Sequence, residues 1–272
     1  MTPLRCRVFT RKMGPRRARD PYDLEPMTTR RIAFEGPINF RDLGGYSVPG
    51  GKHVRWNRLF RSDSLHTITA ADAPLLRDVG VRTAIDFRSS DEIEQMGIGP
   101  LGEVSVRHVH CPTFDRVIDD VTPFEGKTAA EFYAHMMELG SGAYVAAMQA
   151  ILEPDALPAV FFCVAGKDRT GCFAALVLGL VGVSNDEIVR DYELTQEIVP
   201  ILTERRIARA GGGVADEERW KNIPSDLKGA HGHVMEALVA DISKRWGGWE
   251  GYADAVGIGP DLVTRLRDEL VE

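Results

Sequence analysis

Phe-Cys-Val-Ala-Gly-Lys-Asp-Arg-Thr-Gly, residues 162–171, is the stretch that decides how this chain folds. It lies between an apolar run at residues 158–164, which has the composition of a buried strand, and a second apolar run at residues 172–183, which predicts a helix. A strand, a short loop and a helix N-terminus in this order form an anion site. The loop N–H groups and the positive end of the helix dipole converge at one point, so the sequence predicts a bound phosphate there.

Cys163 and Arg169 give this anion site its chemistry. The cradle stabilises the thiolate form of a cysteine, and the planar guanidinium of Arg169 can hold two phosphate oxygens. A nucleophile, an anion cradle and a cationic clamp within seven residues indicate phosphoryl transfer through a phosphocysteine. The other predicted substrate-binding residues are those of the same loop: Val164, Ala165, Gly166, Lys167 and Thr170.

Two details of the loop support this interpretation. Gly166 gives the backbone conformational freedom at the top of the loop, and the Thr170 hydroxyl is expected to hydrogen-bond the sulfur. The loop is not a Walker A nucleotide site. The Gly-Lys pair is followed by Asp168 instead of Ser or Thr, and Phe161 occupies the place of the first glycine.

The loop, together with three further segments, resembles the bacterial tyrosine-phosphatase-like enzymes, a family with mycobacterial and listerial members. Residues 39–45 (Asn-Phe-Arg-Asp-Leu-Gly-Gly) are similar to the N-terminal signature of that family, and residues 86–89 (Asp-Phe-Arg-Ser) to its Asp-Leu-Arg-Ser segment. Asp191-Tyr192 and residues 246–248 resemble its C-terminal helices. The resemblance covers about residues 32–271. It implies an α/β fold with a mostly parallel central sheet flanked by helices, and helical insertions that form a lid over the site.

One position departs from the family pattern. The family has His immediately before the nucleophile, where it helps to hold the loop and tune the thiolate, whereas this chain has Phe162. We expect the phenyl ring to lie behind the sulfur and to give a weaker enzyme. The alternative reading is a pseudophosphatase that binds phosphorylated partners without turnover. A thiol-dependent sulfur transferase also uses a cysteine loop at a helix N-terminus, but the Arg169-Thr170 pair disfavours it.

Two carboxylates compete for the role of the acid that protonates the leaving oxygen. Asp168 lies in the loop and would have to carry a proton at neutral pH, as the resemblance to Lys-Asp-Arg loops of phosphoinositide phosphatases implies. Asp86 follows a neighbouring strand, and it is either the acid or a structural partner of Arg88 or Arg169. We favour Asp168. Lys167 is read as a second cation at the mouth that recognises a further phosphate, or as a solvated side chain.

Composition limits the class of protein. The 272 residues are 44% apolar, and the longest apolar run, residues 172–183, is too short to span a bilayer. The four cysteines have no paired spacing, which fits a reducing compartment and not a disulfide framework. Residues 1–26 carry a net charge of +4, which leaves −11 for the remainder of a chain whose total is −7. An acidic body gives no support to nucleic-acid binding.

We expect the chain to divide into a disordered basic leader over residues 1–30 and a single phosphatase domain over residues 31–272. The leader has no apolar core of a signal peptide. Segments 112–150 and 196–225 are longer than a minimal phosphatase core needs, so they are the candidates for the lid. Asn39–Gly45 is expected to brace the site, with Arg41 and Asp42 forming a pair.

Local patterns place the remaining elements. A turn at residues 49–51 predicts a hairpin, and Thr69 is expected to cap a helix that ends at Gly80. Thr128-x-x-Glu131 and Ser184-x-x-Glu187 are capping boxes that predict further helix starts. Strands alternating with helices favour a largely parallel sheet with Cys163 at its carboxyl edge, where ligands bind in such folds.

These observations predict a cysteine-dependent phosphatase that hydrolyses phosphomonoesters, with no metal or cofactor, and that vanadate inhibits. Phosphotyrosine is the first expected substrate, and phosphoserine, phosphothreonine and phosphoinositides stay open. His108-x-His110-Cys111 has alternating residues on one strand face, but no fourth ligand lies nearby in sequence and we expect no metal there. A phosphorylated protein or a phosphoinositide is the expected partner. The cytoplasm is the expected location, with export without a signal peptide left open.

Overall fold

Short apolar segments of the sequence form the strands of one five-stranded sheet. The computed structural model describes residues 30–101, 103–114, 128–209 and 224–272. The strands lie in the order β1-β4-β7-β5-β6: β1 (Arg41–Asp42), β4 (Leu59–Ser62), β7 (Ala159–Phe162), β5 (Thr83–Asp86) and β6 (Arg107–His110). All pairs are parallel except β1 with β4, so the expected mostly parallel sheet is confirmed.

Side chains of β7 alternate between two apolar cores, one on each face of the sheet. Phe161 and Cys163 belong to the larger core, and Val160 and Phe162 belong to the smaller one. This period of two is what a strand buried on both faces requires. The sheet is therefore covered on both sides, as the sequence predicts.

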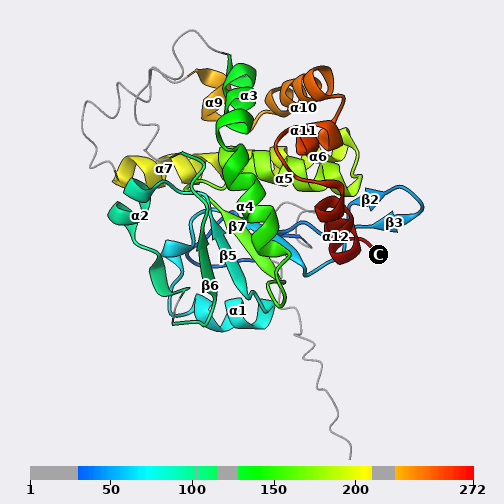
Figure 1. Cartoon of the computed structure of the whole chain (residues 1–272). Helices are drawn as coiled ribbons and strands as arrows, with labels where there is room; N and C mark the ends of the chain where they lie inside the picture. The colour runs from blue at the N-terminus through cyan, green and yellow to red at the C-terminus, as the bar shows by residue number, and fades with distance from the viewer. Residues whose placement is uncertain (1–29, 102, 115–127, 210–223) are drawn as a thin grey trace, which may run out of the picture.

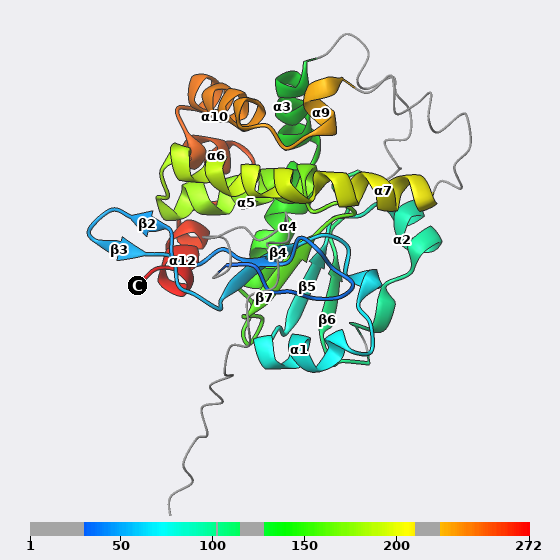
Figure 2. The same ribbon diagram turned by 180° about the vertical axis from the view of Figure 1, so that it is seen from behind.

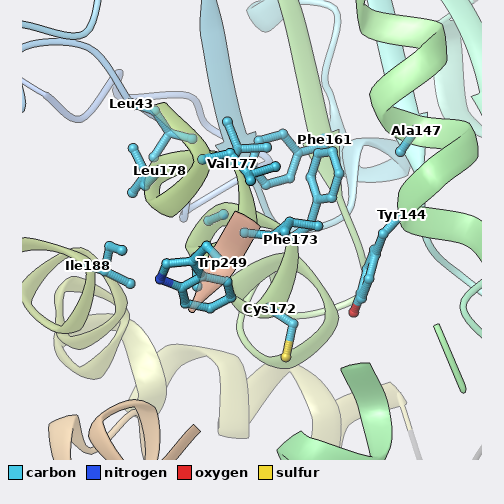
Figure 3. Packing of buried hydrophobic residues seen from close by; sticks show 14 of the residues in the cluster. Leu43, Tyr144, Ala147, Phe161, Cys172, Phe173, Val177, Leu178, Ile188 and Trp249 are labelled. Carbon is cyan, nitrogen blue, oxygen red and sulfur yellow. The ribbon is translucent and has the colours of Figure 1, made fainter. Parts of the chain in front are cut away.

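The larger core forms where α5 (Asp168–Val181) packs against the sheet. Figure 3 shows Phe161, Phe173 and Tyr144 close together in this core. The ring centroid of Phe173 lies 4.9 Å from that of Phe161 and 5.7 Å from that of Tyr144. Aromatic packing of this kind fixes α5, and with it the loop that precedes α5, against β7.

The other helices of the larger core gather around α5. Figure 1 shows α3, α10 and α11 beyond α5, away from the strands, while α4 crosses the sheet. The view from behind in Figure 2 keeps the same arrangement, and α7 extends from α6 through residues 194–198. The bounds are α3 Ala129–Leu139, α4 Ser141–Ile151, α6 Asn185–Glu193, α7 Val199–Arg209, α9 Ser225–Lys228, α10 Gly232–Trp246, α11 Trp249–Ala255 and α12 Pro260–Leu270.

The smaller core is covered by the elements near the N-terminus of the domain. The buried Leu76 of α1 (Asp72–Val79) and Leu65 of the 3-10 turn Leu65–Thr67 pack there. α2 (Ser90–Met96) follows β5 directly, and two more 3-10 segments are Gly99–Leu101 and Leu194–Ile198. The two short strands β2 (Ser47–Val48) and β3 (Lys52–His53) form the predicted hairpin apart from the main sheet.

Several helix boundaries follow the capping patterns. Thr128 and Glu131 form a reciprocal capping box at the start of α3, and Ser184 accepts from the Glu187 amide at the start of α6. Gly80 ends α1 with a φ of 77°, as expected. The helix begins at Asp72, two residues later than a cap at Thr69 predicts. The Thr69 and Asp72 side chains each accept from the amide of the other, which is the reciprocal pattern of a capping box.

The predicted domain limits are only partly within the described residues. Residues 1–29 of the expected leader lie outside them, whereas Arg30 contacts the body and stacks on Tyr46 at 4.0 Å. Parts of both lid candidates, residues 115–127 and 210–223, also lie outside. Tyr144 and Ala147 of α4 are fully buried in the larger core, so this part of segment 112–150 belongs to the core of the domain. Within the described residues, none of the helices has both the length and the apolar character to cross a bilayer.

Candidate active site

Cys163 lies at the carboxyl edge of the sheet, between β7 and α5. Because β4, β5 and β7 are parallel and in register, their carboxyl ends meet at this edge. The cysteine is 2% exposed, and α5 begins at Asp168, so the intervening loop spans residues 163–167. The strand, loop and helix N-terminus that the sequence predicts are therefore in place.

The carbonyl groups of the loop point into the protein body. The Val164 carbonyl accepts from the Ser64 amide at 3.2 Å, and the Ala165 and Gly166 carbonyls accept from Asn39 Nδ2 at 3.2 and 3.1 Å. In a trans peptide the N–H points away from the C=O of the same unit. The amide that follows each of these carbonyls is therefore turned toward the open side of the loop, as an anion cradle requires.

Gly166 is needed for this loop shape. Its φ is +66°, and a Cβ atom there would lie 2.4 Å from the carbonyl oxygen of Ser62. Only glycine combines this backbone conformation with so close an approach. The freedom that the sequence assigned to Gly166 is confirmed.

Arg169, the second residue of α5, is held by a carboxylate that the sequence analysis did not single out. Its two terminal nitrogens donate to the Glu92 carboxylate at 2.6 and 2.9 Å, and one of them also donates to the Phe87 carbonyl at 3.3 Å. Burial alone would lower the pKa of Arg169, but the Glu92 carboxylate outweighs it and raises that pKa. Glu92 caps α2 together with Ser89, so the clamp is fixed to a helix end.

Asp168 begins α5 and stays partly open to solvent, with 29% of its side chain exposed. The Tyr133 hydroxyl of α3 donates to Asp168 Oδ1 at 2.5 Å and lies 2.6 Å from the Tyr192 hydroxyl. Both tyrosines are buried. Asp168 therefore has one oxygen anchored by a phenol at the start of α5, beside the loop.

Asp86, the other acid candidate, is fully buried and engaged. Arg88 donates to both of its oxygens at 2.6–3.0 Å, and His108 Nε2 lies 2.9 Å from Oδ2. Burial tends to raise the pKa of Asp86, but hydrogen bonds from His108 and Arg88 outweigh it and lower that pKa. Asp86 was predicted to be either the acid or a structural partner of Arg88 or Arg169. The structure shows it paired with Arg88. His110 Nε2 lies 2.8 Å from the Arg88 carbonyl oxygen, so this histidine links the end of β6 to the residues that follow β5.

Lys167 has neither of the two roles expected from the sequence. Its residue is 8% exposed, and its ammonium group donates to the carbonyls of Leu227 and Gly229, the latter at 3.1 Å. It also lies 3.3 Å from Asp168 Oδ1. The lysine is thus a buried link between the loop and the segment around α9. The prediction of a free cation at the mouth is wrong.

Two further expectations about the loop are wrong. Thr170 Oγ1 is buried and makes no hydrogen bond to any described residue, so it does not bond the Cys163 sulfur. The Phe162 ring packs in the smaller core with Phe40 and Phe60, and the Arg88 guanidinium lies 5.4 Å from its centroid. Because successive strand residues face opposite sides, the ring is not behind the sulfur.

The expected Arg41–Asp42 pair is also replaced by other contacts. Arg41 is paired with Asp191 at 3.2 Å, while the Asp42 carboxylate accepts from the amides of Gly44 and Asn57 at 2.7 Å. Arg61 is the second partner of Asp191, at 2.5 Å. The signature around residue 40 does brace the site, because Asn39 bonds the loop carbonyls and Arg41 pairs with Asp191 of α6 instead of with Asp42.

Three residues of the site were missed in the sequence analysis. Glu92 could have been found, because Ser89-x-x-Glu92 is a capping box that begins at the last residue of the Asp-Phe-Arg-Ser segment. Tyr133 and Arg61 carry no such signal, since their partners lie 35 and 130 residues away in the chain.

Comparisons with known proteins agree with this geometry. A family model described as "Tyrosine phosphatase family" matches residues 32–272. The chain is 30% identical over 250 residues to a protein of Cupriavidus necator named for tyrosine-protein phosphatase activity, covering 87% of this chain and 86% of that protein. It is 29% identical over 273 residues to the triple specificity protein phosphatase PtpB of Mycobacterium tuberculosis, covering 87% of this chain and 97% of PtpB. A solved structure of Pseudomonas aeruginosa TpbA aligns with 50% of this chain and 68% of TpbA at 20% identity, with a TM-score of 0.29.

Proposed function

Because this chain belongs to the tyrosine phosphatase family, we propose that it hydrolyses phosphotyrosine through a phosphocysteine formed on Cys163. The chain is a cysteine-dependent phosphatase that acts on phosphorylated substrates. The observation that carries the proposal is the loop itself. Cys163 stands at the N-terminus of α5, the loop carbonyls are bound to the body, and Arg169 is clamped beside them.

In the first step the Cys163 thiolate attacks the phosphorus atom and the bond from phosphorus to the ester oxygen breaks. The loop amides and Arg169 hold the three non-bridging oxygens, whose charge they stabilise in the transition state. Asp168, protonated, gives its proton to the leaving oxygen. The products are the alcohol or phenol and a phosphoryl group on sulfur.

In the second step Asp168, now a carboxylate, takes a proton from a water molecule as that water attacks phosphorus. The phosphorus–sulfur bond breaks, which returns the Cys163 thiolate and releases phosphate. No oxidant or metal takes part in either step. Asp168 fits both roles because it is at the loop and partly exposed, whereas Asp86 is buried as an ion pair with Arg88.

The surroundings of the loop favour a phosphotyrosine ester. Cys163 is 2% exposed, so a substrate phosphate must reach inward, and a phosphorylated phenol extends further from a backbone than phosphoserine does. Lys167 is committed to the carbonyls of Leu227 and Gly229, which leaves it poorly placed to recognise a second phosphate on an inositol ring. We therefore place phosphoinositides after phosphoproteins, and phosphoserine and phosphothreonine between them. The printed name of PtpB, triple specificity, is a reason to test all three.

We also propose that residues 31–272 form a single domain with a lid within segments 112–150 and 196–225, and that α3 and the segment around α9 connect that lid to the loop. Tyr133 of α3 bonds Asp168, and Lys167 bonds residues 227–229, so both segments are attached directly at the loop. Substrate entry then requires these attachments to loosen. A catalytic thiolate needs reducing conditions, which favours a cytoplasmic location, and export without a signal peptide stays open.

The test is phosphate release from p-nitrophenyl phosphate and from phosphotyrosine, phosphoserine and phosphoinositide substrates, in reductant and without added metal. We expect the wild-type protein to be active and Cys163→Ser to be inactive. Cys111→Ser is the matched control, because burial and then Asp86 raise the pKa of the Cys111 thiol to about 11 and leave it a neutral core residue. A folded wild-type protein that binds vanadate but releases no phosphate would make it a phosphate-binding pseudophosphatase.

A further inference from the structure

Beneath the loop lies a group of buried polar side chains that the two chemical steps do not use. Its members share an exposure of 1% or less and come from three separate elements: Asn39, Arg41, Arg61 and Asp191. Burying two guanidinium groups costs desolvation free energy, so their presence here calls for a reason beyond packing. We name these four residues the support network.

The support network touches the loop at its carbonyl groups. Asn39 Nδ2 donates to the carbonyls of Ala165 and Gly166, and an Arg61 terminal nitrogen donates to Gly166 at 2.8 Å. Gly166 therefore has two donors on one carbonyl oxygen. These bonds turn the next amides toward the phosphate position, so the network determines which way the cradle points.

Asn39 can act in this way because its own orientation is fixed. Arg41 donates to Asn39 Oδ1, which leaves the Nδ2 end for the loop carbonyls. The Asp63 carboxylate accepts from the backbone amides of Ile38 and Asn39, both at 2.9 Å, and holds the main chain at that point. An amide side chain bound on both ends is a rigid spacer between strand β1 and the loop.

The support network also carries an uncompensated charge. Asp191 pairs with both Arg41 and Arg61, and the two arginines outweigh the effect of burial and lower the pKa of Asp191 to about 2. Burial, then Arg61, lowers the pKa of Arg41 to about 10, so Arg41 stays charged at neutral pH. Two cations and one anion leave one net positive charge, and Arg61 places it in contact with the loop backbone.

We infer that Asn39 and Arg61, oriented by Arg41 and Asp191, are positioning residues that set the anion-binding form of the loop and place positive charge beneath Cys163. This inference rests on the proposed function, because it names what prepares the same thiolate and cradle. It also explains how the loop is held in a chain whose residue before the nucleophile is Phe162. The loop is fixed from its carbonyl side, which needs no hydrogen bond from position 162.

The test compares Asn39→Ala and Arg61→Met with wild type in three measurements: orthovanadate affinity, the rate of Cys163 alkylation by iodoacetate at neutral pH, and the melting temperature. We expect about tenfold or greater loss of vanadate affinity in both variants, because the anion-binding amides lose their fixed direction. In Arg61→Met, alkylation at a fixed neutral pH should be slower, since a positive charge that contacts the loop backbone is removed. Arg61→Lys keeps the charge and should restore the alkylation rate more than the vanadate affinity.

Arg58→Met is the matched control. Arg58 precedes the same strand as Arg61 and is also paired with a carboxylate, that of Glu269, but at the amino edge of the sheet. Arg58→Met should have the vanadate affinity and the alkylation behaviour of the wild-type protein. If Arg61→Met does not fold, the vanadate affinity of Asn39→Ala tests the inference, because that substitution removes a neutral side chain and leaves no buried charge unpaired.

Folded variants that melt at lower temperature but bind vanadate and alkylate as wild type does would overturn the inference, since the network would then be structural only. Failure of the proposed function has a different signature. In that case the folded wild-type protein itself releases no phosphate, with or without vanadate binding, whatever the variants do.

Discussion

The two edges of the central sheet use the same residue types in opposite ways. Three arginine–carboxylate pairs at the carboxyl edge have side chains no more than 16% exposed, namely Arg61–Asp191, Arg88–Asp86 and Arg169–Glu92. Ion pairs at the amino edge are at least 31% exposed, namely Arg58–Glu269, Arg82–Asp155 and Arg107–Glu153. Exposed pairs add little to stability, and buried ones cost desolvation. The comparison teaches that, among these six pairs, the buried ones lie at the edge that holds Cys163, where they orient the loop and the clamp.

The largest expected effect is on stability, when the buried network loses its only carboxylate. Asp191→Ala leaves Arg41 and Arg61 buried without their counter-charge and should reduce the free energy of unfolding by about 3–5 kcal/mol. Urea unfolding measures this. Glu153→Ala, which removes a carboxylate from an exposed pair at the other edge, should change it by less than about 0.5 kcal/mol. Equal losses in the two variants would remove the contrast between the edges.

The next effect is on catalysis by Asp168. Asp168→Asn should lower kcat for phosphotyrosine about 10²-fold, since the leaving phenolate loses its proton donor. The loss should be smaller for p-nitrophenyl phosphate, whose leaving group departs without a proton more readily. Steady-state kinetics with both esters measures the difference. Equal losses for the two esters would assign Asp168 a positioning role and reopen the search for the acid.

Acid pH should weaken the carboxyl edge through Asp191. The pKa of Asp191 in the folded protein is lowered to about 2 from an ordinary value of 3.8, so its contribution is fully present above pH 4 and is lost as pH falls toward 2. A shift of that size corresponds to about 2 kcal/mol. The difference in unfolding free energy between wild type and Asp191→Asn should shrink by this amount between pH 5 and pH 2. A difference that is constant with pH would contradict the ionised, paired state of Asp191.

A smaller effect is expected from Glu92, which orients Arg169 without touching the phosphate. Glu92→Gln keeps a hydrogen-bonding side chain but loses the charge and the matched geometry of a carboxylate with a guanidinium. We expect kcat/KM to fall about tenfold, with most of the change in phosphate and vanadate affinity. Glu92→Asp, which keeps the charge, should recover part of the loss. A wild-type value for Glu92→Gln would show that Arg169 is oriented by the loop alone.

The smallest effect should come from the amino edge. Arg107→Ala breaks the exposed pair with Glu153 and should alter the free energy of unfolding by less than about 0.5 kcal/mol, with unchanged kcat/KM. Adding 1 M salt should change the free energy of unfolding of the wild-type protein and of the variant by the same amount. A loss of activity in Arg107→Ala would mean that the amino edge is coupled to the site.

Much of the fold follows from local sequence patterns. The strand, loop and helix at residues 158–183, the capping boxes and the turn at Gly50 and Gly51 depend on neighbours in sequence, and each of these predictions is confirmed. The resemblance to the tyrosine phosphatase family is confirmed as well. These are the features for which local propensity and tertiary structure agree.

The predictions that were wrong concern side chains whose partners are distant in the chain. Lys167 binds carbonyls 60 and 62 residues away, and Arg41 pairs with a carboxylate 150 residues away instead of with its neighbour Asp42. Phe162 was placed behind the sulfur, although strand alternation already puts it on the other face. A buried cation accepts whichever oxygens the tertiary fold brings to it, and spacing in the sequence does not encode that choice.

The central claim is that Cys163, in a loop fixed from beneath, carries the phosphoryl group during turnover. The most direct measurement is mass spectrometry of the peptide that contains Cys163 after rapid quenching of Asp168→Asn during p-nitrophenyl phosphate turnover, a variant in which hydrolysis of the intermediate should be slowed. The account predicts one added phosphoryl group, located on Cys163 and absent from Cys111 and Cys172. A turning-over enzyme with no phosphoryl group on Cys163, or with one on another residue, would contradict it.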